Sequence, residues 1–344
     1  MDRRCFLKGT GCLALGAALP KATSAAALPS GKVKFCAFAD IHHFPGYWPH
    51  GDSEFLEKIL ARADREKTDF VIQLGDFVHD LNLSKDYLDL YAGFGQPTYH
   101  VVGNHEGERQ DLASTLKALK LENPYYFFER NGFRFVVVDP NYFLDTDGAY
   151  RHYESYNLHR ATQAKRVAKG CVLPPEQEEW LKDAVTTSSL PCVVFLHESF
   201  ERPGSVANGP ALMDFFDETN ARHPGRVRMV VNGHYHTDHV RVRNDIVYFD
   251  MNSASYQYFV KAHARYPAEY IATHRNSNHA IAWNDPLSAV VTLETGGKIR
   301  IEGSESTFFR GVTPEMAGLA PRDGLGRPTV PMISSFEFEK RFSV

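Results

Sequence analysis

The chain has 344 residues, which fits one large domain or two ordinary ones. Hydrophobic residues make up 43% of it, enough for a substantial core. The formal net charge of −4 excludes a strongly basic nucleic-acid binder, so we expect no nucleic-acid-binding surface.

The first 27 residues have the composition of an export signal. Arg3 and Arg4 precede the run FLK, a short apolar stretch follows, and three alanines at 25–27 fit a cleavage site. The order R-R-x-F-L-K resembles the twin-arginine signal, with a general secretory signal as the alternative. We therefore expect export in the folded state by the twin-arginine translocase and a periplasmic or secreted location. The apolar stretch is shorter than the ~20 residues that span a bilayer, so we expect no transmembrane helix in the mature form.

The first part of the mature chain alternates between strand and helix patterns. Apolar runs of strand type lie at 32–40, 69–76 and 97–105, and helical periodicity lies at 52–67, 83–94 and 109–120. This order predicts parallel strands joined by crossover helices. An Asn-Gly pair between two apolar runs at 125–139 then predicts a hairpin.

The rest of the chain contains more strands than one simple sheet would hold. Helices are predicted at 174–188 and 210–223, strands at 192–197 and 227–234, hairpins at 239–252 and 287–303, and long irregular segments at 140–171 and 253–285. Two sheets packed face to face, with helices outside, would accommodate the strands. No linker divides the chain, so we predict a single α/β domain over 28–310 and a C-terminal extension, 311–344, that wraps it.

Five of the apolar strands each end in residues of metal-binding type. In chain order these are Asp40 with His42, Asp76, Asn104 with His105, His197, and His234 with His236. Sites form at the carboxyl edge of parallel strands, so this shared position indicates a metal site. Leaving His105 aside, the set is too large for one tetrahedral zinc and suits two adjacent cations with Asp76 as the bridge. Mixed imidazole and oxygen ligands favour Mn, Fe, Zn, Co or Ni over Ca.

The segment VVNGHYHTDH, residues 230–239, admits more than one interpretation. H-x-H-x-D-H is the signature of metallo-β-lactamase-like hydrolases, G-H-x-H closes the motif set of another metallohydrolase family, and a loop that is merely rich in histidine is the third possibility. The first interpretation requires the motif early in the chain and a final histidine far downstream, whereas none follows His279. It also leaves the other strand-end residues without a role. We therefore interpret Asp238 and His239 as turn residues that either support the ligands from behind or lie at the surface.

Five motifs in this order resemble the full set of the calcineurin-like metallophosphoesterases, over roughly residues 33–252. They are D-x-H at Asp40 and His42, G-D at Asp76, G-N-H-E from Gly103 to Glu106, the lone His197, and G-H-x-H from Gly233 to His236. The resemblance implies a four-layer α/β/β/α sandwich of two mixed β-sheets flanked by helices, with a dinuclear site. By the family pattern, Asp40, His42, Asp76 and His236 hold one metal, and Asp76, Asn104, His197 and His234 hold the other.

The resemblance also implies an enzyme that hydrolyses a small phosphoester by attack of a metal-bridging hydroxide, with a phosphodiester slightly preferred over a monoester. His105 stands beside a ligand without being one, so we predict that it protonates the departing oxygen and that Glu106 orients it. His43, His79 and Asn252 are candidates for supporting positions near the pocket. A non-catalytic periplasmic metal-binding protein and a metallohydrolase of a non-phosphate ester are the alternatives.

Overall fold

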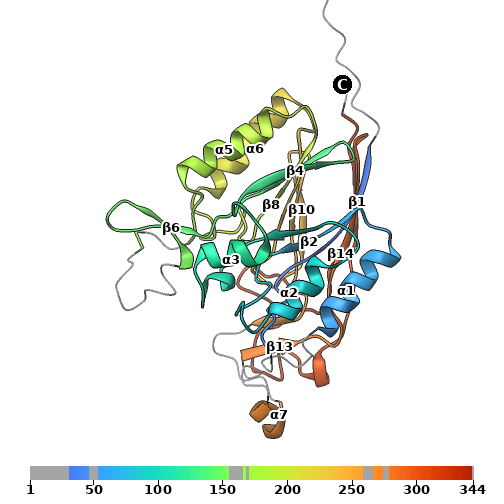
Figure 1. Cartoon of the computed structure of the whole chain (residues 1–344). Helices are drawn as coiled ribbons and strands as arrows, with labels where there is room; N and C mark the ends of the chain where they lie inside the picture. Colours follow the sequence, from blue (N-terminus) through green and yellow to red (C-terminus); the bar gives the residue numbers. More distant parts are fainter. Residues whose placement is uncertain are drawn as a thin grey trace, which may run out of the picture.

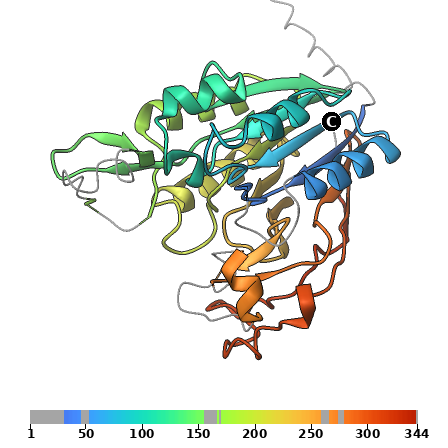
Figure 2. The ribbon, with the colours of Figure 1, turned by 60° about the horizontal axis from the view of Figure 1, so that its bottom comes forward.

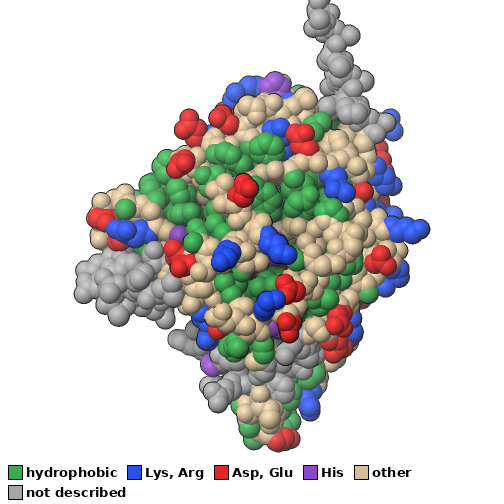
Figure 3. Space-filling model, in the orientation of Figure 1, with side chains coloured by type: hydrophobic (Ala, Val, Ile, Leu, Met, Phe, Trp, Pro, Cys, Tyr) green, Lys and Arg blue, Asp and Glu red, His purple; other side chains and the backbone are tan. Residues whose placement is uncertain are grey.

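A computed structural model of the protein describes residues 31–45, 53–154, 166–167, 170–258, 266–273 and 279–342. The predicted export signal, residues 1–27, lies outside the described residues. Within these ranges, no helix has both the length and the apolar character needed to cross a membrane. On the face drawn in Figure 3, acidic and basic side chains are interspersed rather than gathered into patches of one sign.

Two six-stranded sheets form the centre of the molecule (Figure 1). The first has the order β16-β15-β14-β1-β2-β3 and the second the order β10-β11-β9-β8-β5-β4. The strands of the first sheet are β1 (Lys32–Phe38), β2 (Phe70–Leu74), β3 (Thr98–Val101), β14 (Ala289–Glu294), β15 (Lys298–Glu302) and β16 (Phe336–Glu339). Those of the second are β4 (Tyr126–Arg130), β5 (Phe133–Val137), β8 (Cys192–Phe195), β9 (Val227–Asn232), β10 (His239–Arg243) and β11 (Ile246–Asp250).

The second sheet is parallel at its centre and antiparallel at both edges, whereas the first is parallel from β1 to β3 and antiparallel from β1 to β16. The strands β1, β2 and β3 pair in parallel, and so do β5, β8, β9 and β11. The pairs that involve β4, β10, β14, β15 and β16 are antiparallel. The prediction of parallel strands in the first half and hairpins in the second is therefore confirmed.

Helices cover the outer face of each sheet and complete four layers (Figures 1 and 2). On the first sheet lie α1 (Glu54–Arg65), α2 (Lys85–Ala92) and α3 (Leu112–Leu119), and on the second lie α5 (Pro175–Thr186) and α6 (Gly209–Arg222). Each helical layer packs on its sheet through a hydrophobic cluster, and a further cluster fills the space between the two sheets. The predicted α/β/β/α sandwich is confirmed.

Alternation along the strands explains this layering. On β1, Phe35 faces the opposite sheet, whereas the next residue, Cys36, faces the helices. Phe35 meets Phe135 and Phe195 of the second sheet edge to face, with ring centroids 5.8 and 5.6 Å apart. Because both faces of the central strands are buried, their sequences are continuous apolar runs.

Two segments that the sequence predicts as irregular contain regular structure. Residues 140–171 include the hairpin β6 (Tyr142–Leu144) and β7 (Tyr150–His152). Residues 253–285 include the antiparallel pair β12 (Tyr256–Tyr258) and β13 (Ala280–Ala282), and helix α7 (Ala268–Thr273). These predictions were wrong because a strand of three residues is too short to show a hydrophobic period.

The C-terminal tail does more than wrap the surface. Its strand β16 pairs with β15 and so extends the first sheet. Before that strand, Arg327 forms a buried ion pair with Asp250, and the backbone N–H of Ser334 donates to Asp238 at 3.0 Å. The tail is therefore fastened beside the ends of β9 and β11, close to the histidines that follow β9.

Candidate metal centre

The predicted ligands lie on tight turns that follow strand ends. Five of them have positive φ: Asp40 (52°), His42 (54°), Asp76 (52°), His234 (72°) and His236 (50°). This conformation is unfavourable for residues other than glycine and gathers at functional sites, where the surrounding structure enforces it. A Cβ at Gly75 would lie 2.3 Å from His197 Nδ1, and one at Gly103 would lie 2.2 Å from the backbone nitrogen of Asp76. The two motif glycines therefore let neighbouring strand ends approach each other.

Asp40, His42 and His236 form the first ligand group. The Nε2 atom of His236 lies 3.3 Å from Asp40 Oδ1 and 3.1 Å from His42 Nε2. Asp76 Oδ2 lies 3.7 Å from His42 Nε2. All four side chains are buried. The structure thus brings together the four residues that the family pattern assigns to one metal.

Asp76, His197 and His234 form the second ligand group. His197 Nε2 lies 3.1 Å from Asp76 Oδ2 and 3.2 Å from His234 Nδ1. Asn104 follows β3 beside this group, and its buried Oδ1 has no hydrogen-bond partner among the described residues. A buried acceptor without a partner is costly, and coordination of a cation would satisfy it. Because Asp76 contacts both groups, it lies where a bridging carboxylate must lie.

Each histidine ring is hydrogen-bonded through the nitrogen that points away from the ligand groups, and this bond determines which nitrogen faces the metal site. His236 Nδ1 donates to the carbonyl of Tyr256 at 2.7 Å, so its Nε2 carries a lone pair. His79 Nδ1 lies 3.0 Å from Glu108 Oε2, and a carboxylate can only accept, so His79 donates there. His79 Nε2 therefore accepts from His42 Nδ1 at 2.9 Å, which leaves a lone pair on His42 Nε2 as well.

When both rings are neutral, as metal binding requires, the lone pairs of His42 and His236 face each other across 3.1 Å. Two lone pairs repel at this distance unless a cation lies between them. Burial lowers the pKa of His42 well below its usual value, which favours the neutral ring that a metal requires. The donor set therefore fits a divalent transition metal on chemical grounds.

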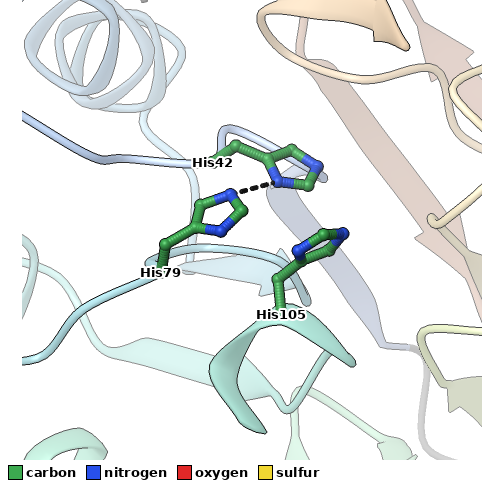
Figure 4. Close-up of side chains that lie close together, drawn as sticks. All are labelled: His42, His79 and His105. Atoms are coloured by element: carbon green, nitrogen blue, oxygen red, sulfur yellow. Dashed lines mark hydrogen bonds between the residues drawn. The ribbon is translucent and has the colours of Figure 1, made fainter. Parts of the chain in front are cut away.

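Glu108 is a functional residue that the sequence interpretation missed. Figure 4 shows the rings of His42 and His79, from the loops after β1 and β2, and of His105, from a short helix, pointing toward one another. Glu108 contacts two of them, because its Oε1 also lies 2.8 Å from His105 Nδ1. The short 3₁₀ helix η1 (His105–Gly107) places positions i and i+3 on one side, so the spacing from His105 to Glu108 was a usable signal.

His105 is partly buried and has carboxylates on two sides. Burial by itself would lower its pKa, but Asp76, with its Oδ2 3.8 Å from Nε2, and Glu108 together raise the pKa to about 9. In the absence of bound cations the ring therefore holds a proton at neutral pH. Since Glu108 contacts Nδ1, the Nε2–H is the proton available to the cavity.

Glu106 does not orient His105, so that part of the hypothesis is wrong. Its fully buried carboxylate accepts four backbone N–H groups, those of Asp76 (3.1 Å), Phe77 (2.5 Å), Val78 (3.1 Å) and Gly103 (2.7 Å). The Glu106 side chain points toward the backbone turn at Asp76 rather than toward the ring of His105. Their adjacency in the sequence did not reveal this direction. Glu106 holds the two motif turns together and thereby positions the backbone of Asp76.

His43 and Asn252 make their described contacts away from the ligand groups. The ring of His43 stacks on Tyr87 of α2, with centroids 3.9 Å apart. The Asn252 amide donates to the carbonyls of Val330 and Met332 in the C-terminal tail, at 2.8 and 3.0 Å. These contacts are structural, in contrast to those of His79, which orients a predicted ligand.

The two ligand groups open into a cavity of about 430 Å³, within the range of small-molecule sites. Its lining residues are His42, Phe44, Asp76, His79, His105, Glu108, Arg109, His234, Tyr235, His236, Tyr256, Gln257 and Tyr258. One wall thus carries predicted ligands, and the others carry aromatic rings and a single arginine. A small phosphoester can reach both ligand groups from this space.

Changing Glu108 to glutamine is expected to weaken metal binding by roughly 10- to 100-fold, the usual effect of losing a group that orients a ligand. The amide removes the negative charge and one of the two acceptor oxygens that His79 and His105 share. Titration against a competing chelator measures the affinity. Glu122→Gln, at an exposed position, is the matched control, and equal affinities in the two variants would contradict the role given to Glu108.

The comparisons with known proteins agree with this geometry. Residues 33–238 match the family described as calcineurin-like phosphoesterase. A dimetal phosphatase from Danio rerio is similar in structure, with a TM-score of 0.56 and 15% identity over 89% of this chain and 98% of that chain. GAP50, described as the anchor in the inner membrane complex of Plasmodium, has a TM-score of 0.46 and 13% identity over 81% of this chain and 85% of that one. No curated protein sequence matches the chain.

At 15% identity the dimetal phosphatase shows the fold alone, whereas the family match spans more than half of the chain. The matched region contains all the predicted metal ligands, from Asp40 to His236. The family expected from the five ordered motifs is therefore confirmed. This chain belongs to the calcineurin-like phosphoesterases and is a metal-dependent hydrolase of phosphoric esters.

Proposed function

We propose that the protein hydrolyses a small phosphodiester at a centre of two divalent transition-metal ions that share Asp76. The observation that carries the proposal is the pair of adjacent ligand groups, with Asp76 in contact with His197 of one and His42 of the other. When bound, the cations supply an activated water and neutralise the charge of the phosphoryl oxygens. Mn, Fe, Zn, Co and Ni all suit these ligands.

The chain's own residues orient the ligands and supply a proton. Asp76 lines the cavity beside both ligand groups, and His105 lines it from η1. With Glu108 on its Nδ1, His105 presents Nε2–H to the departing oxygen and acts as the general acid. We favour a diester over a monoester because the motif set resembles that of compact bacterial phosphodiesterases.

The test is hydrolysis of p-nitrophenyl phosphate and bis(p-nitrophenyl) phosphate by the mature protein, before and after loading with Mn²⁺. We expect hydrolysis that depends on metal, faster with the diester, and close to two ions per chain by elemental analysis. Full activity with at most one ion would contradict the dinuclear centre. Tight metal binding without hydrolysis of any phosphoester would favour a non-catalytic metal-binding protein.

We also propose that the chain is exported by the twin-arginine route, a proposal that rests on Arg3 and Arg4. Replacing both with lysine is expected to keep the precursor in the cytoplasm, because the signal is read through this pair. Cell fractionation followed by immunoblotting measures the distribution. Normal periplasmic accumulation of the wild-type chain in a strain that lacks the translocase would contradict the proposal and favour the general secretory route.

A further inference from the structure

One wall of the cavity leads away from the proposed acid, His105, to residues that have no role in the proposed reaction. From His105 the wall continues to His79, whose ring centroid is 4.6 Å away, and from His79 to Phe44, 6.3 Å further (Figure 4 shows the first two rings). The guanidinium carbon of Arg109 lies 4.8 Å from the centre of the Phe44 ring. These four side chains, which we call the outer wall, form a continuous row from the proposed acid to an arginine.

The charge of Arg109 has no carboxylate partner among the described residues. The acidic neighbour in sequence, Glu108, is already shared by His79 and His105. The contact with Phe44 favours one position of the guanidinium, and the N–H groups make no hydrogen bond to another of the residues that the structure describes. A guanidinium held in this way is suited to bind a planar or tetrahedral anion with two N–H groups at once.

The position of Arg109 places it on the leaving-group side of the substrate. Arg109 follows His105 by four residues and lines the same cavity. If His105 gives its proton to the departing oxygen, the outer wall lies along the leaving group, while the ligand groups hold the phosphoryl group. An anionic group on the leaving group would therefore lie toward Arg109 and away from the metals.

We propose that Arg109 selects phosphoric esters whose leaving group carries a second anionic group, either a carboxylate or a phosphate. The proposal rests on the proposed function, because it assigns a specificity residue to the same site. A lone cation on an aromatic wall stabilises such a leaving group through charge-assisted hydrogen bonds. A neutral leaving group of the same shape leaves the guanidinium without that partner.

The test compares three aryl esters of methyl phosphate, with the matching monoesters as a second set. Their leaving groups are 4-carboxyphenol, 4-phosphonooxyphenol and the neutral 4-carbamoylphenol, which has nearly the shape of the first. We expect wild-type kcat/KM to favour at least one charged ester over the neutral one by roughly tenfold to a hundredfold, the range of hydrogen bonds to charged groups. The carboxylate and phosphate arms show which anion the site accepts.

Arg109→Gln is expected to bring this ratio close to one, mainly through KM. Arg109→Lys should keep only part of it, because the charge remains but the paired N–H groups are lost. Arg222→Gln, which removes an exposed arginine of α6 that pairs with Glu218 at 2.9 Å, should keep the wild-type ratio. Thermal unfolding of each variant checks that the fold is intact.

Two outcomes would overturn the inference: a wild-type ratio near one, or a ratio that Arg109→Gln leaves unchanged. Both can occur with active enzyme and would leave the proposed function standing. Failure to hydrolyse all of the esters after metal loading would instead contradict the proposed function. The two failures are therefore distinguishable.

Discussion

Asp76→Asn is expected to lower hydrolysis by roughly a thousandfold or more, the upper range for loss of one positioned electrostatic group, and to release both cations together. Asp76 Oδ2 lies 3.1 Å from His197 Nε2 and 3.7 Å from His42 Nε2, so one oxygen serves both ligand groups. The other oxygen accepts the backbone N–H of His105 at 2.8 Å. An asparagine that kept this bond would turn its N–H₂ toward the ligand groups, where it cannot coordinate.

The charge of Asp76 makes the effect larger. Burial opposes ionisation, but His197 and His105 hold the pKa of this carboxyl well below its usual value, so it is ionised at neutral pH. Metal content by elemental analysis and kcat on the preferred ester measure the result. Asp86→Asn, on the exposed face of α2, is the matched control. Retention of one fully occupied cation by Asp76→Asn would show that the two sites are independent and would contradict the bridge.

His105→Ala is expected to show a loss that depends on the leaving group. A p-nitrophenolate departs readily without a proton, so the hydrolysis rate of its esters should fall only slightly. An alkoxide needs the proton, and its esters should lose roughly 10²- to 10⁴-fold, the scale of general acid catalysis. Metal content should stay near normal, because His105 is not among the residues assigned to either cation. The measurement is kcat/KM across esters of graded leaving-group pKa.

The pH profile gives a second test of the same role. A general acid must be protonated, so the wild-type rate on alkoxide esters should fall as pH rises through the pKa of His105. The carboxylates place that pKa at about 9, and bound cations will lower it, so the fall is expected at or below that pH. The rate of His105→Ala should not show this fall at high pH. A deficit that is the same for every leaving group would mean that His105 is not the acid.

The sequence was sufficient to predict the ligand groups because their geometry follows from chain direction. Parallel strands present their carboxyl ends at one edge, so Asp40 and Asp76 of the first sheet lie together. His197 follows a strand of the second sheet and joins them because the two predicted sheets pack face to face. Roles that depend on the direction of a side chain could not be predicted in this way, because chain direction does not determine the rotamer. Glu106 was assigned to its sequence neighbour His105, whereas its carboxylate binds backbone amides of the two adjoining turns.

Short elements were missed for a related reason. The strand β16 has the sequence FEFE, an alternation that indicates a strand, but four residues at the end of an irregular tail gave too weak a signal. Its partner β15 ends at Glu302, so the pairing spans a long stretch of irregular chain. Glu108 was missed although its i, i+3 spacing from His105 was a usable signal, because its second contact, to His79, exists only in the folded chain.

The order of strands in the first sheet also constrains when the metal centre can form during synthesis. β1, which leads into Asp40, lies between β2 and β14, and it pairs with β14 over Lys32 to Ala37. When the ribosome has passed His236, every predicted ligand has been made, but Ala289–Glu294 has not. One edge of β1 remains open until almost the whole chain has emerged. The first sheet, which positions Asp40 and Asp76, can therefore be completed only near the end of translation, so the finished fold exists only when synthesis is almost over.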